Sequence, residues 1–193
     1  YMKTGTNTVL PIFPLGRVVF PNSVVKLQIF EQRYLSMISE QLSKPLSEPK
    51  GFGVCLIKKG NEVGIPATPF HYGTYVEIVD FDQSSEGLLN ITCLGKQQFT
   101  INSLESLPSH LLSANVSWLE PLQQKVMLEE ESELVHLLQD LSQHPEVDII
   151  DEPEKWNELG FVMERLTEYM PISEFQKQAI LETSQLDLRQ SML

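Results

Sequence analysis

The chain has 193 residues, 41% of them hydrophobic, and a formal net charge of −12 at pH 7. This length can bury a sizeable core in one domain or in two small ones. No apolar run approaches the roughly 20 residues that a membrane-spanning helix needs, and no basic segment followed by a long apolar one opens the chain, which argues against a membrane protein and a signal peptide. We therefore expect a cytoplasmic protein in which Cys55 and Cys93 are buried, reduced thiols.

The stretch 10–34, LPIFPLGRVVFPNSVVKLQIFEQRY, combines two apolar extended segments with the start of a helix. Pro11 and Pro14 remove backbone donors, which favours the edge or the beginning of a strand. From Val24 the side chains alternate between two faces, as in a half-buried strand. At Phe30–Glu31 the spacing changes to that of a helix. We expect the rest of the chain to be organised around this stretch.

The middle of the chain has the pattern of a bent sheet. Residues 65–72 contain two prolines, so we expect a structured loop there that exposes Phe70 and Tyr72. Further strands are predicted at 53–58, 74–82, 88–94, 98–104 and 112–118, the last with clear alternation. About six or seven strands with one helix predict an antiparallel, strongly bent sheet or a partly open barrel.

The last third of the chain is helical and acidic. Helical spacing is predicted from about Gln123, then after Pro153, and again after Ser173, which with Gln176 fits a capping box; a short helix after Asp187 would end the chain. Residues 119–193 hold five Lys or Arg and seventeen Asp or Glu, whereas residues 1–118 hold nine of each. This shift predicts two subdomains, 1–120 rich in strands and 121–193 an acidic helical bundle.

Several motifs together resemble a known family. The stretch 10–34 is similar to the opening LP-x-FPL…V-x-FP…L-x-IFE-x-RY of the Lon N-terminal domain, also called the LON substrate-binding domain. The resemblance continues at Gly51–Ile57, at Gly73–Thr74 and at Gly95 with Phe99, and it ends at Met170–Ser173. It implies an α+β fold, a PUA-like β-barrel followed by a small α-helical bundle, and it favours a complete small protein.

The resemblance implies recognition of polypeptide without cleavage. We expect a non-catalytic module that binds exposed apolar segments of unfolded polypeptides, or a protein partner, in connection with a Lon-type protease system. Two alternatives come from other classes. PUA-like barrels bind RNA in other proteins, although an acidic chain without a basic stripe disfavours nucleic acid. An unrecognised hydrolase would need residues that the sequence does not supply.

The search for catalytic, cofactor and metal motifs finds none. The P-loop pattern is missing, because Gly95–Lys96 has no glycine five residues upstream. The four histidines do not have H-E-x-x-H spacing, and two cysteines 38 positions apart do not form a zinc motif. We therefore predict no enzyme activity, no cofactor and no metal.

The candidate binding residues each have a structural alternative. Arg33 could bind a peptide carbonyl or carboxylate through its guanidinium, with Tyr34 beside it; the alternative is an ion pair within the fold and a core tyrosine. Aromatic side chains could line an apolar groove, or they could simply pack the core. The groove between the barrel and the helical bundle is the expected site, with these candidates: Phe20, Arg33, Tyr34, Phe70, Tyr72 and Trp118.

Overall fold

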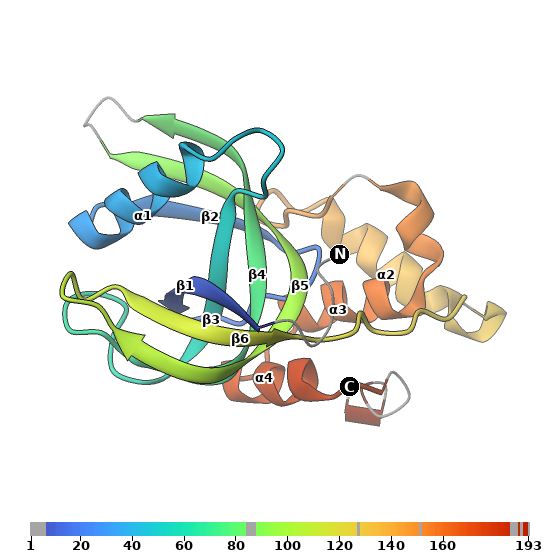
Figure 1. Ribbon diagram of the computed structural model, residues 1–193. Helices are drawn as coiled ribbons and strands as arrows, with labels where there is room; N and C mark the ends of the chain where they lie inside the picture. The colour runs from blue at the N-terminus through green and yellow to red at the C-terminus, as the bar shows by residue number, and fades with distance from the viewer. Residues whose placement is uncertain are drawn as a thin grey trace.

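The strands come first in the chain and most of the helices last. The computed structural model of the protein describes residues 7–83, 88–126, 128–150, 152–185, 189, 191 and 192. Their elements are β1 (Asn7–Leu15), β2 (Val24–Ile29), α1 (Gln32–Leu42), β3 (Gly51–Lys59), β4 (Thr68–Gln83), β5 (Leu89–Ser106), β6 (Leu112–Trp118), η1 (Glu129–Glu131), α2 (Ser132–Ser142), η2 (Pro153–Asn157), α3 (Leu159–Tyr169) and α4 (Glu174–Glu182). The fold is α+β, as predicted (Figure 1).

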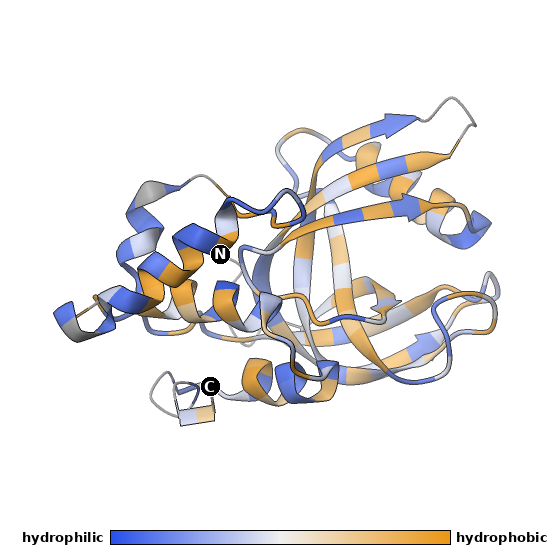
Figure 2. Ribbon diagram, turned by 180° about the vertical axis from the view of Figure 1, so that it is seen from behind, coloured by the Kyte–Doolittle hydropathy of each residue, from blue (hydrophilic) through white to orange (hydrophobic). Residues whose placement is uncertain are grey.

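The six strands form one sheet that closes on itself. Their order is β2-β5-β4-β3-β1-β6, and an additional pairing of β5 with β6 closes a ring of β5, β4, β3, β1 and β6, with β2 paired to β5 beside it. The ring can close because β5 is long and bent: its first part pairs with β2, and its last part pairs with β6. In Figure 2, hydrophobic and hydrophilic residues alternate along several strands, as expected where one face points into a core.

One strand pair differs from the predicted antiparallel arrangement. β1 and β3 are parallel, with Ile12 opposite Gly53, while the other pairs in the sheet are antiparallel. Parallel neighbours need a long crossover. Here β2 and α1 supply that crossover, because both lie between β1 and β3 in the chain. The prediction of an antiparallel sheet therefore holds for the other pairs and is wrong for β1 and β3, because sequence patterns do not show the direction of pairing.

Two predicted boundaries in the middle of the chain also change. β4 begins at Thr68, so most of the predicted loop 65–72 is strand. Pro69 is tolerated near the beginning of the strand, where the register with β3 shifts. The predicted strands 88–94 and 98–104 are one strand, β5. The register between β4 and β5 shifts next to Gly95, and only glycine fits there, because a Cβ would lie 2.2 Å from the carbonyl oxygen of Phe20.

The helices of the last third of the chain pack on two different parts of the molecule. α2 packs on α3 around the fully buried Leu138 and Phe161. In contrast, α4 lies against the outside of the barrel, where Ile180 and Leu181 pack with Phe20 (Figure 1). The three helices therefore do not form a self-contained bundle.

The helix boundaries agree only in part with the prediction. The capping box of Ser173 and Gln176 at the start of α4 is confirmed. The helix predicted from about Gln123 begins later: residues 121–125 are not helical, Val126 bridges to Glu158, and α2 starts at Ser132. The helix predicted after Asp187 lies largely outside the described residues, although Arg189, Ser191 and Met192 are helical.

Candidate functional site

Two of the six predicted binding residues are fully buried. Phe20 is 0% exposed and packs with residues of β3 and α4, and Trp118 is 1% exposed. The Trp118 indole donates a hydrogen bond to the Thr8 hydroxyl at 2.9 Å and packs edge-on against Tyr75 and Phe99. These contacts occupy both side chains in the core, so in this structure they offer no surface to a ligand.

Arg33 and Tyr34, at the start of α1, contact neighbours within the fold. The Arg33 guanidinium is 3.0 Å from a Glu31 carboxylate oxygen and donates to the His110 carbonyl at 3.1 Å. Tyr34 stacks on Phe13 with ring centroids 4.2 Å apart, and burial raises the pKa of its hydroxyl to about 12. The ion pair and the packed ring are the contacts that the structural alternative requires. They hold α1 against the barrel and the loop before β6.

Phe70 and Tyr72 are the two predicted residues that reach a large cavity. Both are half-buried, and they line a space of about 520 Å³ where β4 and β5 separate. Lys58, Thr100, Ile101 and Glu182 also contribute to its wall. Because Glu182 belongs to α4 and the others to the barrel, the cavity lies where the barrel meets α4.

The cavity borders a stretch of β4 that is not paired with β5. Pairing between β4 and β5 begins only at Tyr72 and Thr100. Before that point β4 pairs on its other side with β3, and beyond it β5 pairs on its other side with β6. No strand pairing in the described structure joins residues 68–71 to residues 101–104 across this gap, which we call the β4–β5 opening. An unpaired strand edge, such as that of β4 at residues 68–71, can hydrogen-bond to an added extended chain.

An aromatic pair borders the opening. The rings of Phe70 and Phe175 meet edge to face with centroids 5.6 Å apart, and Phe175 is 61% exposed. The Lys58 ammonium lies 5.8 Å from the centroid of Phe70. The Gln178 amide donates to the Tyr72 carbonyl at 3.2 Å, so α4 holds this part of β4 in place. Phe175 was not among the residues predicted from the sequence; its position two residues after the helix cap Ser173, on an otherwise polar turn, is the signal that could have found it.

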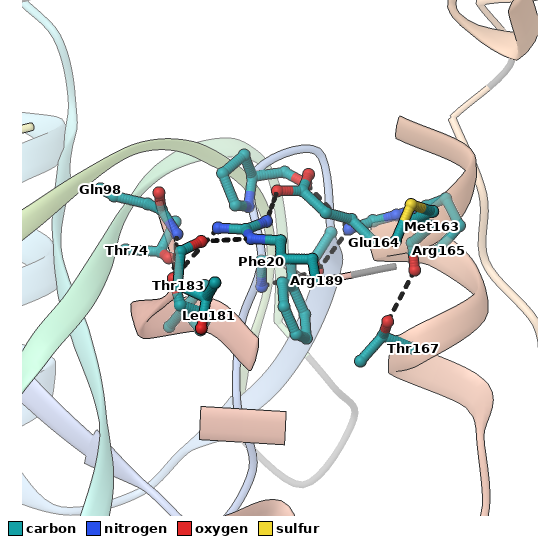
Figure 3. Close-up of polar contacts among 12 residues, drawn as sticks. Phe20, Thr74, Gln98, Met163, Glu164, Arg165, Thr167, Leu181, Thr183 and Arg189 are labelled. Atoms are coloured by element: carbon teal, nitrogen blue, oxygen red, sulfur yellow. Dashed lines mark hydrogen bonds and ion pairs between the residues drawn. The ribbon is translucent and has the colours of Figure 1, made fainter. Parts of the chain in front are cut away.

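A second contact region between the barrel and the helices is filled by buried charges (Figure 3). Arg189 donates to the Glu164 carboxylate at 2.7 Å and to the carbonyls of Thr183 and Leu181. Arg165 donates to the Pro21 carbonyl at 2.8 Å. Burial raises the pKa of Glu164, and the two guanidiniums oppose that rise.

The space beside this buried cluster is small. The cavity that Glu164 lines measures about 40 Å³, which is enough for a water molecule or two but not for a peptide side chain and its backbone. Because its charged groups are engaged with one another and with backbone carbonyls, the cluster has the character of a structural joint between α3, the C-terminal turn and the barrel.

Both cysteine thiols are buried, and the described residues hold no cluster of metal ligands. Among them, no group of three or more His, Cys, Asp or Glu side chains is placed to hold a metal ion. Cys55 and Cys93 are free and buried, as predicted, and burial raises the pKa of Cys93 to about 12 and that of Cys55 well above its usual range. Protonated, buried thiols are poor nucleophiles. In the same part of the chain, no helix is long and apolar enough to cross a membrane.

Comparison with known proteins gives consistent results. The family model described as the ATP-dependent protease La (LON) substrate-binding domain matches residues 9–193. A crystal structure of a Lon N-terminal domain protein from Xanthomonas campestris is similar, with 28% identity, 95% of each chain covered and a TM-score of 0.75. No curated protein sequence matches the chain significantly.

The N-terminal domain of a Lon protease from the Mycobacterium avium complex shares the fold, with a TM-score of 0.64, 16% identity and 96% of each chain covered. The family match covers nearly the whole chain, from the first strand through α4, and neither this match nor the structural likeness includes an ATPase or protease domain. The chain belongs to the LON substrate-binding domain family.

Proposed function

We propose that the protein is a non-catalytic recognition module that binds exposed apolar segments of unfolded polypeptides in the β4–β5 opening. The family description as a substrate-binding domain supports the binding of protein substrates. A Lon-type protease system is the setting in which such a module would act. The observation that carries the choice of site is the unpaired edge of β4 beside two half-buried aromatic rings, Phe70 and Tyr72.

A bound segment would be extended. Residues advance by about 3.3 Å along a strand, so three or four residues would fill the unpaired edge, alternate side chains meeting the aromatic wall. Backbone pairing is independent of sequence, which suits a module that accepts many substrates. The acidic net charge of −12 disfavours the RNA-binding alternative, because neutralising phosphates requires a basic surface.

The affinity should be modest. Each backbone hydrogen bond contributes about 1 kcal/mol net, and burial of one or two apolar side chains adds roughly 2 kcal/mol each. Loss of translational freedom and ordering of a flexible segment oppose these gains. A Kd between roughly 10 μM and 1 mM follows.

Titration of the isotopically labelled chain with a reduced, unfolded model polypeptide tests the proposal. Backbone amide shifts should cluster at residues 68–72, at residues 100–102 and around Phe175. Phe70→Ala should weaken binding by about threefold to tenfold. Phe81→Ala is the matched control, because Phe81 is also on β4, is 57% exposed and pairs with Ile91 away from the opening.

Two results would count against the proposal. If Phe70→Ala keeps its fold and binds as tightly as the unaltered chain, the site is wrong. If no backbone amide signal shifts at millimolar concentrations of the polypeptide, the hypothesis of general polypeptide binding is wrong. A single specific protein partner then becomes the better hypothesis. The absence of catalysis is tested separately: turnover of a fluorogenic peptide, with or without ATP, would contradict it.

A further inference from the structure

A second, more apolar groove lies on the helical half, away from the β4–β5 opening. It has a volume of about 510 Å³ and runs between α2 and α3. Its walls include Leu134, Leu137 and Leu141 from α2 and Met163, Leu166 and Met170 from α3 and its C-cap. This volume is typical of a ligand-binding cleft, and the walls are almost entirely apolar.

The groove has the shape that a third helix requires. On α2 the lining residues recur at three- and four-residue intervals and form one ridge, whereas the α3 wall runs from Met163 through Leu166 and ends at residues 169–171. Met163 and Leu166 are buried and form the floor, whereas Leu137 at the rim is 51% exposed. A groove between such a ridge and wall accepts a helix whose apolar residues are spaced i, i+3 or i+4, and i+7. Met170, which is partly exposed, gives a surface that adapts to different side chains.

The surroundings of the groove are acidic. Residues 126–154, which include α2, contain ten Asp or Glu and no Lys or Arg. Glu133 and Asp140 are exposed, and each lies about one helical turn from Leu137 on the surface of α2. An apolar stripe bordered by carboxylates complements a helix that is apolar on one side and basic on the other.

The same charges argue against a second copy of the chain as the occupant. A dimer through this face would bring two acidic α2 helices together in a protein that already carries a net charge of −12, and like charges at an interface oppose association. We propose that the α2–α3 groove binds a basic amphipathic helix of another protein, with apolar residues of the helix on Leu137 and Met170 and its Lys or Arg side chains beside Glu133 and Asp140.

The probe for this proposal is a synthetic helical peptide of about 16 residues, long enough to keep partial helicity in water. It carries leucines along one face and lysines elsewhere. A scrambled peptide of the same composition and a peptide with glutamate in place of lysine serve as ligand controls. Binding is followed by fluorescence anisotropy, and backbone amide shifts of the full chain locate the contact.

The basic amphipathic peptide should bind and move amides of α2 and α3. Leu137→Lys should weaken binding by about tenfold or more, because it places a cation in the apolar rim. The matched control is Val79→Lys, which makes the same kind of change at a position on β4 that is 57% exposed. The pair Glu133→Gln and Asp140→Asn should weaken binding several-fold at low salt and much less at high salt.

Four results would overturn the proposal. Equal binding of the scrambled peptide would mean that net charge alone attracts it. Equal binding of the glutamate peptide would remove the role of the carboxylates. Amide shifts at the β4–β5 opening instead of α2 would show that the groove is not the site. Concentration-dependent self-association that Leu137→Lys abolishes would identify a second copy as the occupant. Phe70→Ala should leave binding of the basic amphipathic peptide unchanged, because Phe70 borders the β4–β5 opening and not the α2–α3 groove. A failure of the groove proposal is therefore distinguishable from a failure of the proposed function.

Discussion

The buried ion pair between Glu164 and Arg189 should contribute strongly to the stability of the fold, so replacing one partner should be strongly destabilising. The Arg189 side chain is 1% exposed and Glu164 is 3% exposed. Arg189 also donates at 2.6 Å to the Thr183 carbonyl, just after α4, so one side chain connects α3 to the end of the chain. Replacing it by methionine, which has a similar length, removes the charge and the hydrogen bonds while keeping apolar volume.

The expected loss is large. Removing one partner of a buried pair leaves the other charge without compensation, which costs about 3–5 kcal/mol in free energy of unfolding. Arg165 remains near Glu164 and opposes part of this loss. The control is Lys26→Met, which breaks an exposed ion pair: the Lys26 side chain is 63% exposed and that of its partner Asp148 is 43% exposed. Loss of such a pair lowers the free energy of unfolding by at most about 1 kcal/mol.

The pH dependence has a definite sign. Burial raises the pKa of Glu164 above its ordinary value of 4.5, and the Arg189 charge opposes that rise. The native chain therefore holds this proton to higher pH than the unfolded chain does, so this group lowers stability as pH rises from 4.5 through its native pKa. Without Arg189 the native pKa of Glu164 rises further. The loss in free energy of unfolding caused by Arg189→Met should therefore be smallest below the native pKa that Glu164 has in the unaltered chain, and it should grow as the pH rises above that value.

Urea unfolding at several pH values, with circular dichroism as the signal, measures these quantities. The double variant Glu164→Gln with Arg189→Met should recover most of the loss, because it removes the uncompensated carboxylate. If Arg189→Met loses no more stability than Lys26→Met, or if its deficit does not change with pH, then the buried pair does not act as described.

Three further predictions concern the fold. Gly95→Ala should destabilise the chain by about 2–3 kcal/mol, since its Cβ would lie 2.2 Å from the Phe20 carbonyl oxygen; an unchanged urea midpoint would contradict the close approach. Ser173→Ala should lower stability by about 1 kcal/mol, because the Ser173 hydroxyl accepts from the Gln176 amide at 3.3 Å, and amide hydrogen exchange should rise first in α4 if this is correct. Cys55 and Cys93 are buried, with pKa values raised by burial, so iodoacetamide should modify them only in denaturant; rapid modification of the native chain would show that the barrel opens.

Local patterns were enough for several elements. Leu112, Ala114, Val116 and Trp118 are buried in alternation along β6, as the spacing of the sequence predicts. The capping box at Ser173 marks the start of α4 correctly. These features depend on interactions within a few residues, so a linear pattern contains the information that determines them.

The candidate site was only partly accessible to sequence reasoning. Phe70 and Tyr72 were selected for a loop, yet they lie in a strand, and the opening beside them exists because β4 and β5 diverge. Phe20 and Trp118 have the same aromatic character but are core residues. Residue type alone does not distinguish an aromatic wall from an aromatic core, because the difference depends on which distant segments cover the ring.

The family, the α+β order and the acidity of the last third of the chain can be inferred from the linear chain, because motif spacing, periodicity and composition are linear properties. The parallel pairing of β1 with β3, the packing of α4 on the barrel and the contact of Arg189 with Glu164 become visible only in the folded molecule. Each of these depends on segments far apart in the chain that come together to bury apolar surface and to pair buried charges. The free energy of such contacts is absent from any local window of sequence.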